Sequence, residues 1–271
     1  MTTDAVVVDK VTKVFNQGRA DEVVALSEVD LAVGAGEFVS LIGPSGCGKS
    51  TLLRLIADLI PPTTGTVTVA GLDAGAARRK QEYGIAFQQA GLFEWRTVRR
   101  NVELPLELRG MARSERTARA EEMLDLVGLA DFAGHYPAQL SGGMQQRVAI
   151  ARALAVQPPL LLMDEPFGAL DEMTRERMQT ELVRICGETG AAVVFVTHSI
   201  PEAVFLSNRV VVMSPRPGRI RDVLTVDLGR SGERGDALRE DEHFFAGVSA
   251  VRELLHGDAV PKAAVRGVEN R

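Results

Sequence analysis

One short glycine-rich segment constrains this chain more than any other feature. Residues 43–51 have the sequence GPSGCGKST and lie between an apolar run, FVSLI, and a helix-forming stretch, STLLRLIADL. Glycines let backbone N–H groups approach phosphate oxygens without interference from a Cβ atom. The N-terminus of the following helix adds a partial positive charge. The pattern G-x-x-x-x-G-K-[ST] between a strand and a helix therefore predicts a phosphate-binding loop rather than a chance glycine-rich turn.

The residue types in this loop predict specific roles in a nucleotide site. Lys49 can neutralise β- and γ-phosphates, and the Ser50 hydroxyl can ligate Mg²⁺. Cys47 occupies a free position of the motif and is either a small filler residue or a redox-sensitive thiol, because a helix N-terminus favours the thiolate. The predicted nucleotide-binding residues of the loop are Gly43, Pro44, Ser45, Gly46, Cys47, Gly48, Lys49, Ser50 and Thr51.

Two adjacent carboxylates follow another apolar run, at residues 160–163. Neighbouring side chains along a strand point to opposite sides, so one carboxylate can hold Mg²⁺ while the other faces an attacking water. We predict Asp164 as the metal ligand and Glu165 as the general base. An acidic pair at a strand end is often only a helix N-cap, so this prediction depends on the phosphate loop being present.

Two other polar side chains also follow apolar runs. His198 comes after residues 193–197, at a strand end where open α/β sheets bind ligands. We expect it to contact a γ-phosphate and hold water and base in line; the alternative is a structural histidine. Gln88 comes after residues 85–87, and its amide could reach a metal ion or water, although this signal is weak by itself. With Lys49 and Glu165, these two residues form the predicted catalytic set.

A second glycine-rich segment opens a predicted helix. Residues 140–147 have the sequence LSGGMQQR. Ser141 and the two glycines after it form either a second anion site at a helix N-terminus or an ordinary N-cap. The N-cap alternative does not explain why one chain combines two phosphate-type sites with an acidic pair.

The order of apolar and helical segments predicts an α/β fold. Short Val- and Ile-rich runs bounded by glycine, proline or charge are typical of buried parallel strands covered by helices. These runs lie at residues 5–8, 38–42, 66–69, 85–87, 160–163, 193–196 and 210–213, and predicted helices lie at 50–58, 145–155 and 173–188. The predicted organisation is a core in two parts (1–96 and 158–226), an inserted helical subdomain (97–157) and a C-terminal helical tail (227–271).

The composition narrows the class of protein further. Lys and Arg number 31 against 36 Asp and Glu, a net charge of −5, without the basic surplus typical of nucleic-acid binders. Two cysteines, Cys47 and Cys186, are too few for a disulfide framework or a four-cysteine zinc site. We expect no secretory signal and no membrane span, because a span needs about 20 apolar residues. In the tail, we predict one apolar helix face that packs on the core or contacts a partner, formed by Phe244, Phe245, Val248, Val251, Leu254 and Leu255.

Taken in order, these motifs resemble those of the ATP-binding-cassette (ABC) ATPases. The matching segments are the phosphate loop at 43–51, a glutamine loop at Gln88, LSGGMQQR at 140–147, LLLMDEP at 160–166, GALD at 168–171 and a switch histidine at His198. The resemblance covers roughly residues 5–225. It implies an ABC-type P-loop ATPase core, a RecA-like mixed sheet with helices on its faces, together with an antiparallel β region and an inserted helical subdomain.

The resemblance also implies a head-to-tail homodimer that holds two ATP molecules between its subunits. Each ATP would be bound by the phosphate loop of one chain and by Ser141, Gly142, Gly143 and Gln145 of the other. Phe15 matches the residue that stacks on adenine, and its alternative is a core phenylalanine. Asp171 matches the loop that crosses the dimer seam. The implied cofactors are ATP and Mg²⁺, with Ser50, Gln88 and Asp164 as the implied metal ligands.

Within that family, the chain is similar to the ATPase subunits of bacterial nitrate, sulfonate and taurine importers. The similarity lies in EWRTVRRNV at 94–102, MQTEL at 178–182 and MSPRPGRI at 213–220. It departs from that branch at Glu94, usually proline, and at Asn208, usually aspartate. The similarity implies permease subunits in the membrane, an indirect solute-binding protein, and a peripheral location on the cytoplasmic face of the inner membrane. The alternatives are a soluble ABC ATPase acting on nucleic acid or ribosomes, and a P-loop kinase.

Overall fold

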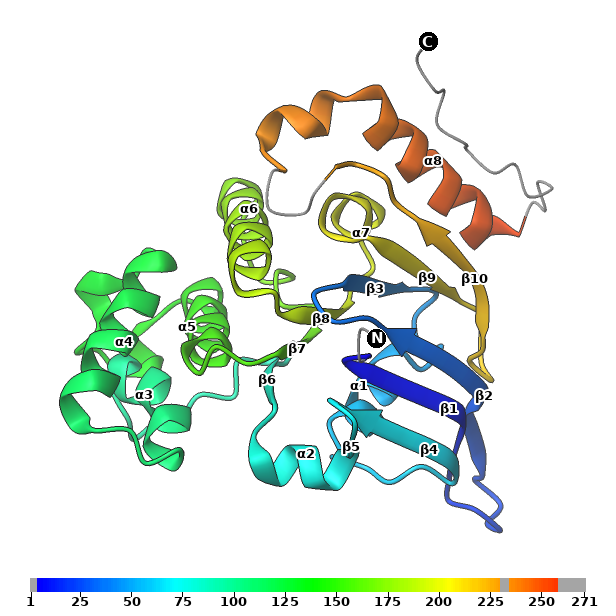
Figure 1. Cartoon of the computed structure of the whole chain (residues 1–271), viewed down its shortest axis with the longest axis horizontal. Helices are drawn as coiled ribbons and strands as arrows, with labels where there is room; N and C mark the ends of the chain where they lie inside the picture. Colours follow the sequence, from blue (N-terminus) through cyan, green and yellow to red (C-terminus); the bar gives the residue numbers. More distant parts are fainter. Residues whose placement is uncertain (1–3, 230–233, 258–271) are drawn as a thin grey trace.

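The computed structural model describes residues 4–229 and 234–257, which form two β-sheets and the helices packed on them (Figure 1). The larger sheet has six strands in the order β10-β9-β3-β8-β7-β6, and only its β10 edge is antiparallel. The smaller sheet is antiparallel, in the order β2-β1-β4-β5. The strands are β1 (Val6–Phe15), β2 (Val23–Val33), β3 (Phe38–Ile42), β4 (Thr64–Val69), β5 (Leu72–Asp73), β6 (Tyr83–Ala86), β7 (Leu160–Asp164), β8 (Ala192–Val196), β9 (Arg209–Met213) and β10 (Ile220–Thr225).

Helices cover the sheets, and the apolar core consists of two clusters, one on each face of the large sheet. Leu52 and Ile56 of α1 pack with apolar residues of both sheets, so α1 lies between them. On the other face of the large sheet, α5 to α8 contribute to a second cluster. The helices are α1 (Lys49–Ile56), α2 (Ala74–Lys80), α3 (Val98–Leu108), α4 (Arg113–Leu126), α5 (Gly142–Ala155), α6 (Glu172–Thr189), α7 (Ile200–Leu206) and α8 (Glu242–His256), with 3₁₀ turns at Ala130–Phe132, Pro137–Gln139 and Asp236–Glu240.

The central strands explain why the sequence predicted their positions. Every residue of β3, β7 and β8 is buried, as expected for parallel strands covered on both faces. Because these strands are parallel, their carboxyl ends meet at one edge of the sheet, where the phosphate loop, Asp164 and the segment after β8 follow. The strand order therefore brings the predicted site residues to a common edge.

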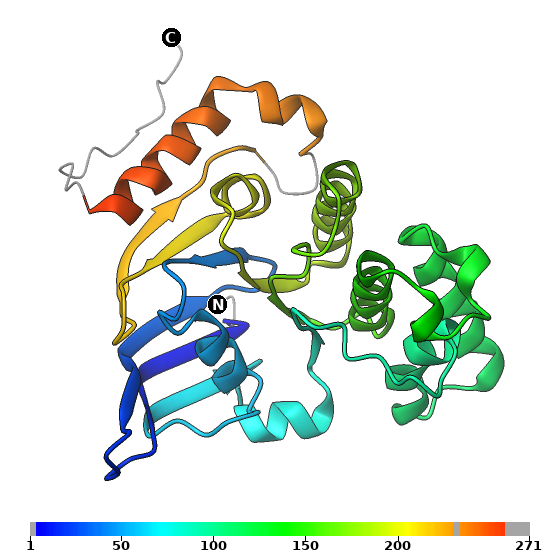
Figure 2. The same cartoon turned by 180° about the vertical axis from the view of Figure 1, so that it is seen from behind.

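The segment between β6 and β7 is helical, as predicted. Helices α3, α4 and α5 group together and project beside the large sheet in both views (Figures 1 and 2). Their contact surface buries Val102, Leu106, Leu124 and Val148 completely. The helical nature of this segment is confirmed, whereas its exact limits at 97 and 157 stay a prediction.

The C-terminal segment packs onto the core through two arginines and one helix face. Arg234, which is buried, donates to the carbonyls of Phe205 (2.8 Å) and Ser207 (2.9 Å), at the end of α7. Burial lowers the pKa of Arg234 to about 10. The Arg239 guanidinium lies 3.8 Å from the centroid of the Phe205 ring and donates to Gln179 Oε1 at 2.7 Å. These contacts fix the segment against α6 and α7.

One predicted member of the apolar face of α8 is wrong. Phe244, Val248 and Val251 are buried, but Phe245 is 57% exposed. Residues 244, 248 and 251 lie four and three positions apart and share one face, whereas residue 245 lies about 100° further around the helix. Residues 230–233 and 258–271 of the predicted tail lie outside the described residues. Among the described residues, no helix is long and apolar enough to span a membrane.

Candidate active site

A cavity of about 750 Å³ opens at the carboxyl edge of the large sheet. The phosphate loop forms one wall, and the segments after β6, β7 and β8 add polar side chains. The side facing the smaller sheet is lined by residues of β1 and β2. The lining residues are Phe15, Val23, Ala25, Ser45, Gly46, Gly48, Lys49, Ser50, Thr51, Gln88, Glu165, His198 and Arg216.

The phosphate loop connects β3 to α1 and requires glycine at two of its positions. A Cβ on Gly43 would lie 2.8 Å from the Met213 carbonyl oxygen, and Gly48 has a φ of +105° with Leu26 directly beside it. Gly48 is the N-cap of α1 and has no side chain that could cap the helix, so no N-cap side chain occupies the first N–H groups of α1. Lys49 Nζ donates to the carbonyls of Gly43 (2.8 Å) and Pro44 (3.3 Å).

Cys47, within this loop, is almost fully buried, at 1% exposure. Its Sγ lies 3.9 Å from Lys49 Nζ. The burial favours the filler interpretation, because oxidation of a thiol requires access.

The carboxylate of Asp164, at the end of β7, faces the first turn of α1. Ser50 Oγ donates to Asp164 Oδ1 at 2.8 Å, and Asp164 is 4% exposed. Burial raises the pKa of this carboxyl, while the hydrogen bond from Ser50 opposes that rise. A hydroxyl and a carboxylate in contact are the hard oxygen donors that Mg²⁺ prefers, so this pair fits the predicted metal site.

The carboxylate of Glu165 lies beside Gln88 and His198. The backbone φ of Glu165 is +47°, and its N–H donates to the Val196 carbonyl at 2.9 Å, which holds the turn after β7 against β8. Gln88 Nε2 lies 3.5 Å from Glu165 Oε2, and His198 Nδ1 lies 3.2 Å from the same oxygen. An ionised carboxylate only accepts hydrogen bonds, so the ring N–H of His198 is the donor. The structure thus brings together all three polar residues predicted around the attacking water.

Phe15 lies at the end of β1 on the apolar side of the cavity. Phe15 is 38% exposed, and Lys13 Nζ lies 5.1 Å from the centroid of its ring. An exposed aromatic face on a cavity wall fits the stacking interpretation better than the core interpretation.

The predicted second anion site lies outside the cavity. Ser141 is the N-cap of α5 and accepts a hydrogen bond from Met144 N, while Ser141 and Gly142 are both exposed. The side-chain amide of Gln145 donates to the carbonyls of Pro137 and Leu140 in the same chain. None of Ser141, Gly142, Gly143 and Gln145 lines the cavity.

Asp171 also lies outside the cavity. It is the N-cap of α6, where its Oδ1 accepts from Thr174 N at 3.0 Å. The hydrogen bonds of this cap hold the pKa of Asp171 below its usual range.

Sequence reasoning missed Arg216, Val23 and Ala25 as cavity residues. The Arg216 guanidinium donates to the Gly46 carbonyl at 3.2 and 3.3 Å, across 170 positions of sequence. Gly218 makes this approach possible, since a Cβ there would lie 1.9 Å from the Cys47 carbonyl oxygen. The segment MSPRPGRI was singled out only for its similarity to one branch of a family, and no local signal placed it beside the phosphate loop.

Comparisons with known proteins place the whole chain in a family. The family model described as ABC transporter matches residues 26–168. The chain is 47% identical over 225 residues to the taurine import ATP-binding protein TauB of Yersinia pestis, covering 82% of this chain and 88% of that one. It is also 47% identical over 247 residues to the nitrate import ATP-binding protein NrtD of Synechocystis sp., covering 89% and 91%.

A solved structure is similar over most of its length. The dimeric, post-hydrolysis ATP-binding cassette MJ0796 bound to ADP and Pi has a TM-score of 0.75 and 40% identity, covering 82% of this chain and 99% of that one. The family match and the identities confirm the predicted fold class, a P-loop core with an antiparallel sheet and an inserted helical region. The chain belongs to the ABC transporter family and is one of its ATPases.

Proposed function

We propose that the chain is the ATP-hydrolysing subunit of an importer and works as a head-to-tail homodimer. The observation that carries this proposal is the division of the site. One chain lines a cavity with residues of the phosphate loop and with Glu165, and Asp164 contacts Ser50 of that loop, while its Ser141 segment is exposed elsewhere on the surface. A second copy can complete the cavity with its own Ser141 segment, and the related cassette MJ0796 is dimeric.

In this proposal the phosphate loop binds the triphosphate of ATP. The Lys49 ammonium, which hydrogen-bonds two loop carbonyls, supplies a positive charge within reach of the phosphates. Ser50 and Asp164 would hold Mg²⁺, with Gln88 as a further ligand, and the ion would neutralise phosphate charge when bound. Phe15 would stack on the adenine, which needs only a flat aromatic face and no contact to a base edge.

The residues around Glu165 perform the hydrolysis step. Glu165 accepts a proton from the attacking water, and His198 and Gln88 keep its carboxylate in place. Cleavage removes the γ-phosphate, to which His198 and the partner's Ser141 segment are bound in the closed dimer. In this proposal the dimer closes because ATP has a higher affinity for the closed state than for the open state.

The transport role rests on the relatives. TauB and NrtD are import ATP-binding proteins for taurine and nitrate. We infer permease partners in the membrane, a solute-binding protein that reaches this chain only through them, and a position on the cytoplasmic face of the inner membrane. Residues 90–102 would pass the motion to the permease, and Trp95 within them is 74% exposed. We infer a small solute such as nitrate, sulfonate or taurine.

The alternative of an ABC ATPase acting on nucleic acid has little support. The chain carries a net charge of −5, and a phosphate-backbone binder usually has a basic surplus. Purification with a membrane protein would support the importer, whereas purification with nucleic acid would support the alternative. Uptake by vesicles that contain the complete transporter, measured with nitrate, an alkanesulfonate and taurine, shows which of these it transports.

Ser141→Arg tests the shared site. The added side chain should block the approach of the partner without changing the cavity of its own chain. We expect ATP binding per chain to persist while hydrolysis falls about 100-fold or more, as when a preorganised phosphate contact is lost. Ser114→Arg, at an exposed position near the start of α4, is the matched control and should retain hydrolysis. Wild-type turnover in Ser141→Arg would contradict the shared site.

A further inference from the structure

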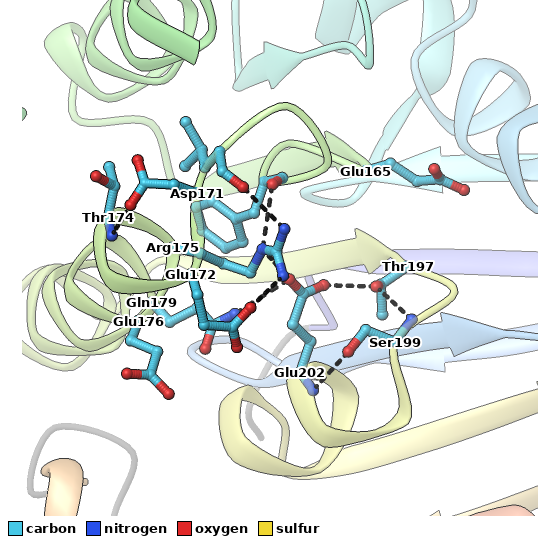
Figure 3. Close-up of polar contacts among 12 residues, drawn as sticks. Glu165, Asp171, Glu172, Thr174, Arg175, Glu176, Gln179, Thr197, Ser199 and Glu202 are labelled. Carbon is cyan, nitrogen blue, oxygen red and sulfur yellow. Dashed lines mark hydrogen bonds and ion pairs between the residues drawn. The ribbon is translucent and has the colours of Figure 1, made fainter.

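A buried carboxylate that has no part in the reaction above lies close to His198. Glu202, in α7, is 8% exposed and is contacted from three sides (Figure 3). Thr197 Oγ1 donates to it at 2.6 Å, Gln179 Nε2 donates at 3.1 Å, and Arg175 Nε lies 3.8 Å away. Burying a carboxylate without such partners costs free energy. A charged group with three dedicated partners is therefore not explained by apolar packing alone.

The first side of this cluster consists of Thr197 and Ser199, the residues on either side of His198. The Thr197 hydroxyl that donates to Glu202 also accepts from the Ser199 N–H at 2.9 Å, and Ser199 Oγ accepts from the Glu202 N–H at 3.4 Å. The residues on either side of His198 are therefore tied to Glu202 and to each other (Figure 3). The His198 side chain itself is 70% exposed, so few of its own contacts fix it in place.

The second side reaches the loop at residues 168–171. Arg175 donates to the carbonyls of Leu170 (2.8 Å) and Phe167 (3.4 Å), and its guanidinium faces Glu202 (Figure 3). This loop contains Asp171, the residue predicted to lie at the dimer seam. A chain of polar contacts thus runs from the seam loop through Arg175 and Glu202 to Thr197 and Ser199, the two sequence neighbours of His198.

The third side comes from α6. Gln179, which is 2% exposed, donates to Glu202 and accepts from Arg239 of the C-terminal segment at 2.7 Å. Burial raises the pKa of Glu202, while Thr197, Arg175 and Gln179 act in the opposite direction. Buried ion pairs generally add little net stability compared with apolar packing. The role of this cluster therefore lies in the geometry that it fixes.

We propose that Glu202 is a positioning residue: acting through Thr197, it holds His198 in contact with Glu165, and acting through Arg175, it ties His198 to the seam loop. The inference rests on the proposed function, because it assigns His198 a role in hydrolysis. Formation of the dimer seam and placement of His198 are then linked events within one chain. ATP hydrolysis is favoured only when both are in place.

Thr197→Val tests the link, since it keeps the side-chain shape and removes the hydroxyl. We expect kcat to fall about 10- to 100-fold with KM for ATP little changed, the loss typical of a displaced catalytic group. Thr197→Ser, which restores the hydroxyl, should recover kcat. In a His198→Ala background, Thr197→Val should have no further effect, because residues that act through one group are not additive. Glu202→Gln, which preserves volume, should show the same dependence on His198.

The control removes a buried hydroxyl at the other end of α7. Ser207 is fully buried and hydrogen-bonds Ser40 Oγ at 2.5 Å. Ser207→Ala should lower Tm and change kcat by the same factor with or without His198.

Three results would overturn the inference. The first is wild-type kcat in both Thr197→Val and Glu202→Gln. The second is a loss of kcat in both variants that is equally large with His198 and with His198→Ala. Wild-type turnover in His198→Ala alone would instead refute the catalytic role of His198, and with it this inference.

Discussion

Replacing Glu165 with glutamine isolates the proposed general base from everything else in the cavity. The substitution keeps the size of the side chain and an oxygen that can accept from His198, which lies 3.2 Å from Oε2. It also keeps the backbone conformation, because the left-handed φ of +47° costs Glu and Gln the same free energy. The Ser50–Asp164 pair, at 2.8 Å, does not involve Glu165. The variant therefore loses the capacity to accept a proton and little else.

The expected loss follows from that single change. A positioned general base contributes about 10²- to 10⁴-fold, which corresponds to about 3–5 kcal/mol of activation free energy. We expect kcat to fall within this range while ATP binding persists. Because hydrolysis reopens the proposed dimer, the variant should also accumulate as an ATP-bound dimer.

Phosphate release and gel filtration with ATP measure the two effects. Glu28→Gln is the matched control, since Glu28 has the same φ of +47° and lies exposed, away from the cavity. Adding Ser141→Arg to Glu165→Gln should return the dimer to a monomer. Turnover by Glu165→Gln close to that of Glu28→Gln would refute the assignment of the base. A persistent monomer with bound ATP would refute the link between hydrolysis and dimer opening.

Two other predictions concern the same cavity. Asp164→Asn should abolish hydrolysis but raise the Tm of the nucleotide-free chain, because burial raises the pKa of Asp164 and its charge therefore destabilises the fold above that pKa. This loss of stability disappears as the pH falls below 3.8, the ordinary pKa of an aspartate. The difference in Tm between variant and wild type, measured by calorimetry, should therefore shrink on acidification. A lower Tm in the variant at neutral pH contradicts this. Arg216→Ala should raise KM for ATP several-fold with a smaller effect on kcat, because Arg216 lines the cavity and braces Gly46; an unchanged KM in phosphate-release assays contradicts this.

The sequence predicted the parallel core well because burial on both faces leaves a continuous apolar signal. Strands β3, β7 and β8 lie where such runs predicted them, to within one residue. Strand β2 was not predicted, since its buried residues alternate with exposed ones. That alternation, clearest at Val29, Leu31 and Val33, is the signal that would have found it.

The site was predictable only where its residues form local motifs. The phosphate loop and the acidic pair are each contiguous, so their residue types and spacing predict the chemistry. Arg216 reaches Gly46 through the packing of Gly218 on Cys47. The cluster around Glu202 joins Arg175, Gln179 and Thr197 from different elements. Such contacts depend on the tertiary fold, and no spacing along the chain encodes them.

One backbone torsion separates the roles of the two adjacent carboxylates. Asp164 ends β7 in extended conformation and meets Ser50, while Glu165 adopts a left-handed conformation, with a φ of +47°, and meets His198. This conformation costs a non-glycine residue about 1–2 kcal/mol. The Glu165 N–H, bound to the Val196 carbonyl, helps to hold it. Strain of this kind persists where the surrounding structure fixes it. The strained conformation of Glu165 therefore lowers the stability of the fold, and it directs one carboxylate toward the metal site and the next toward the water.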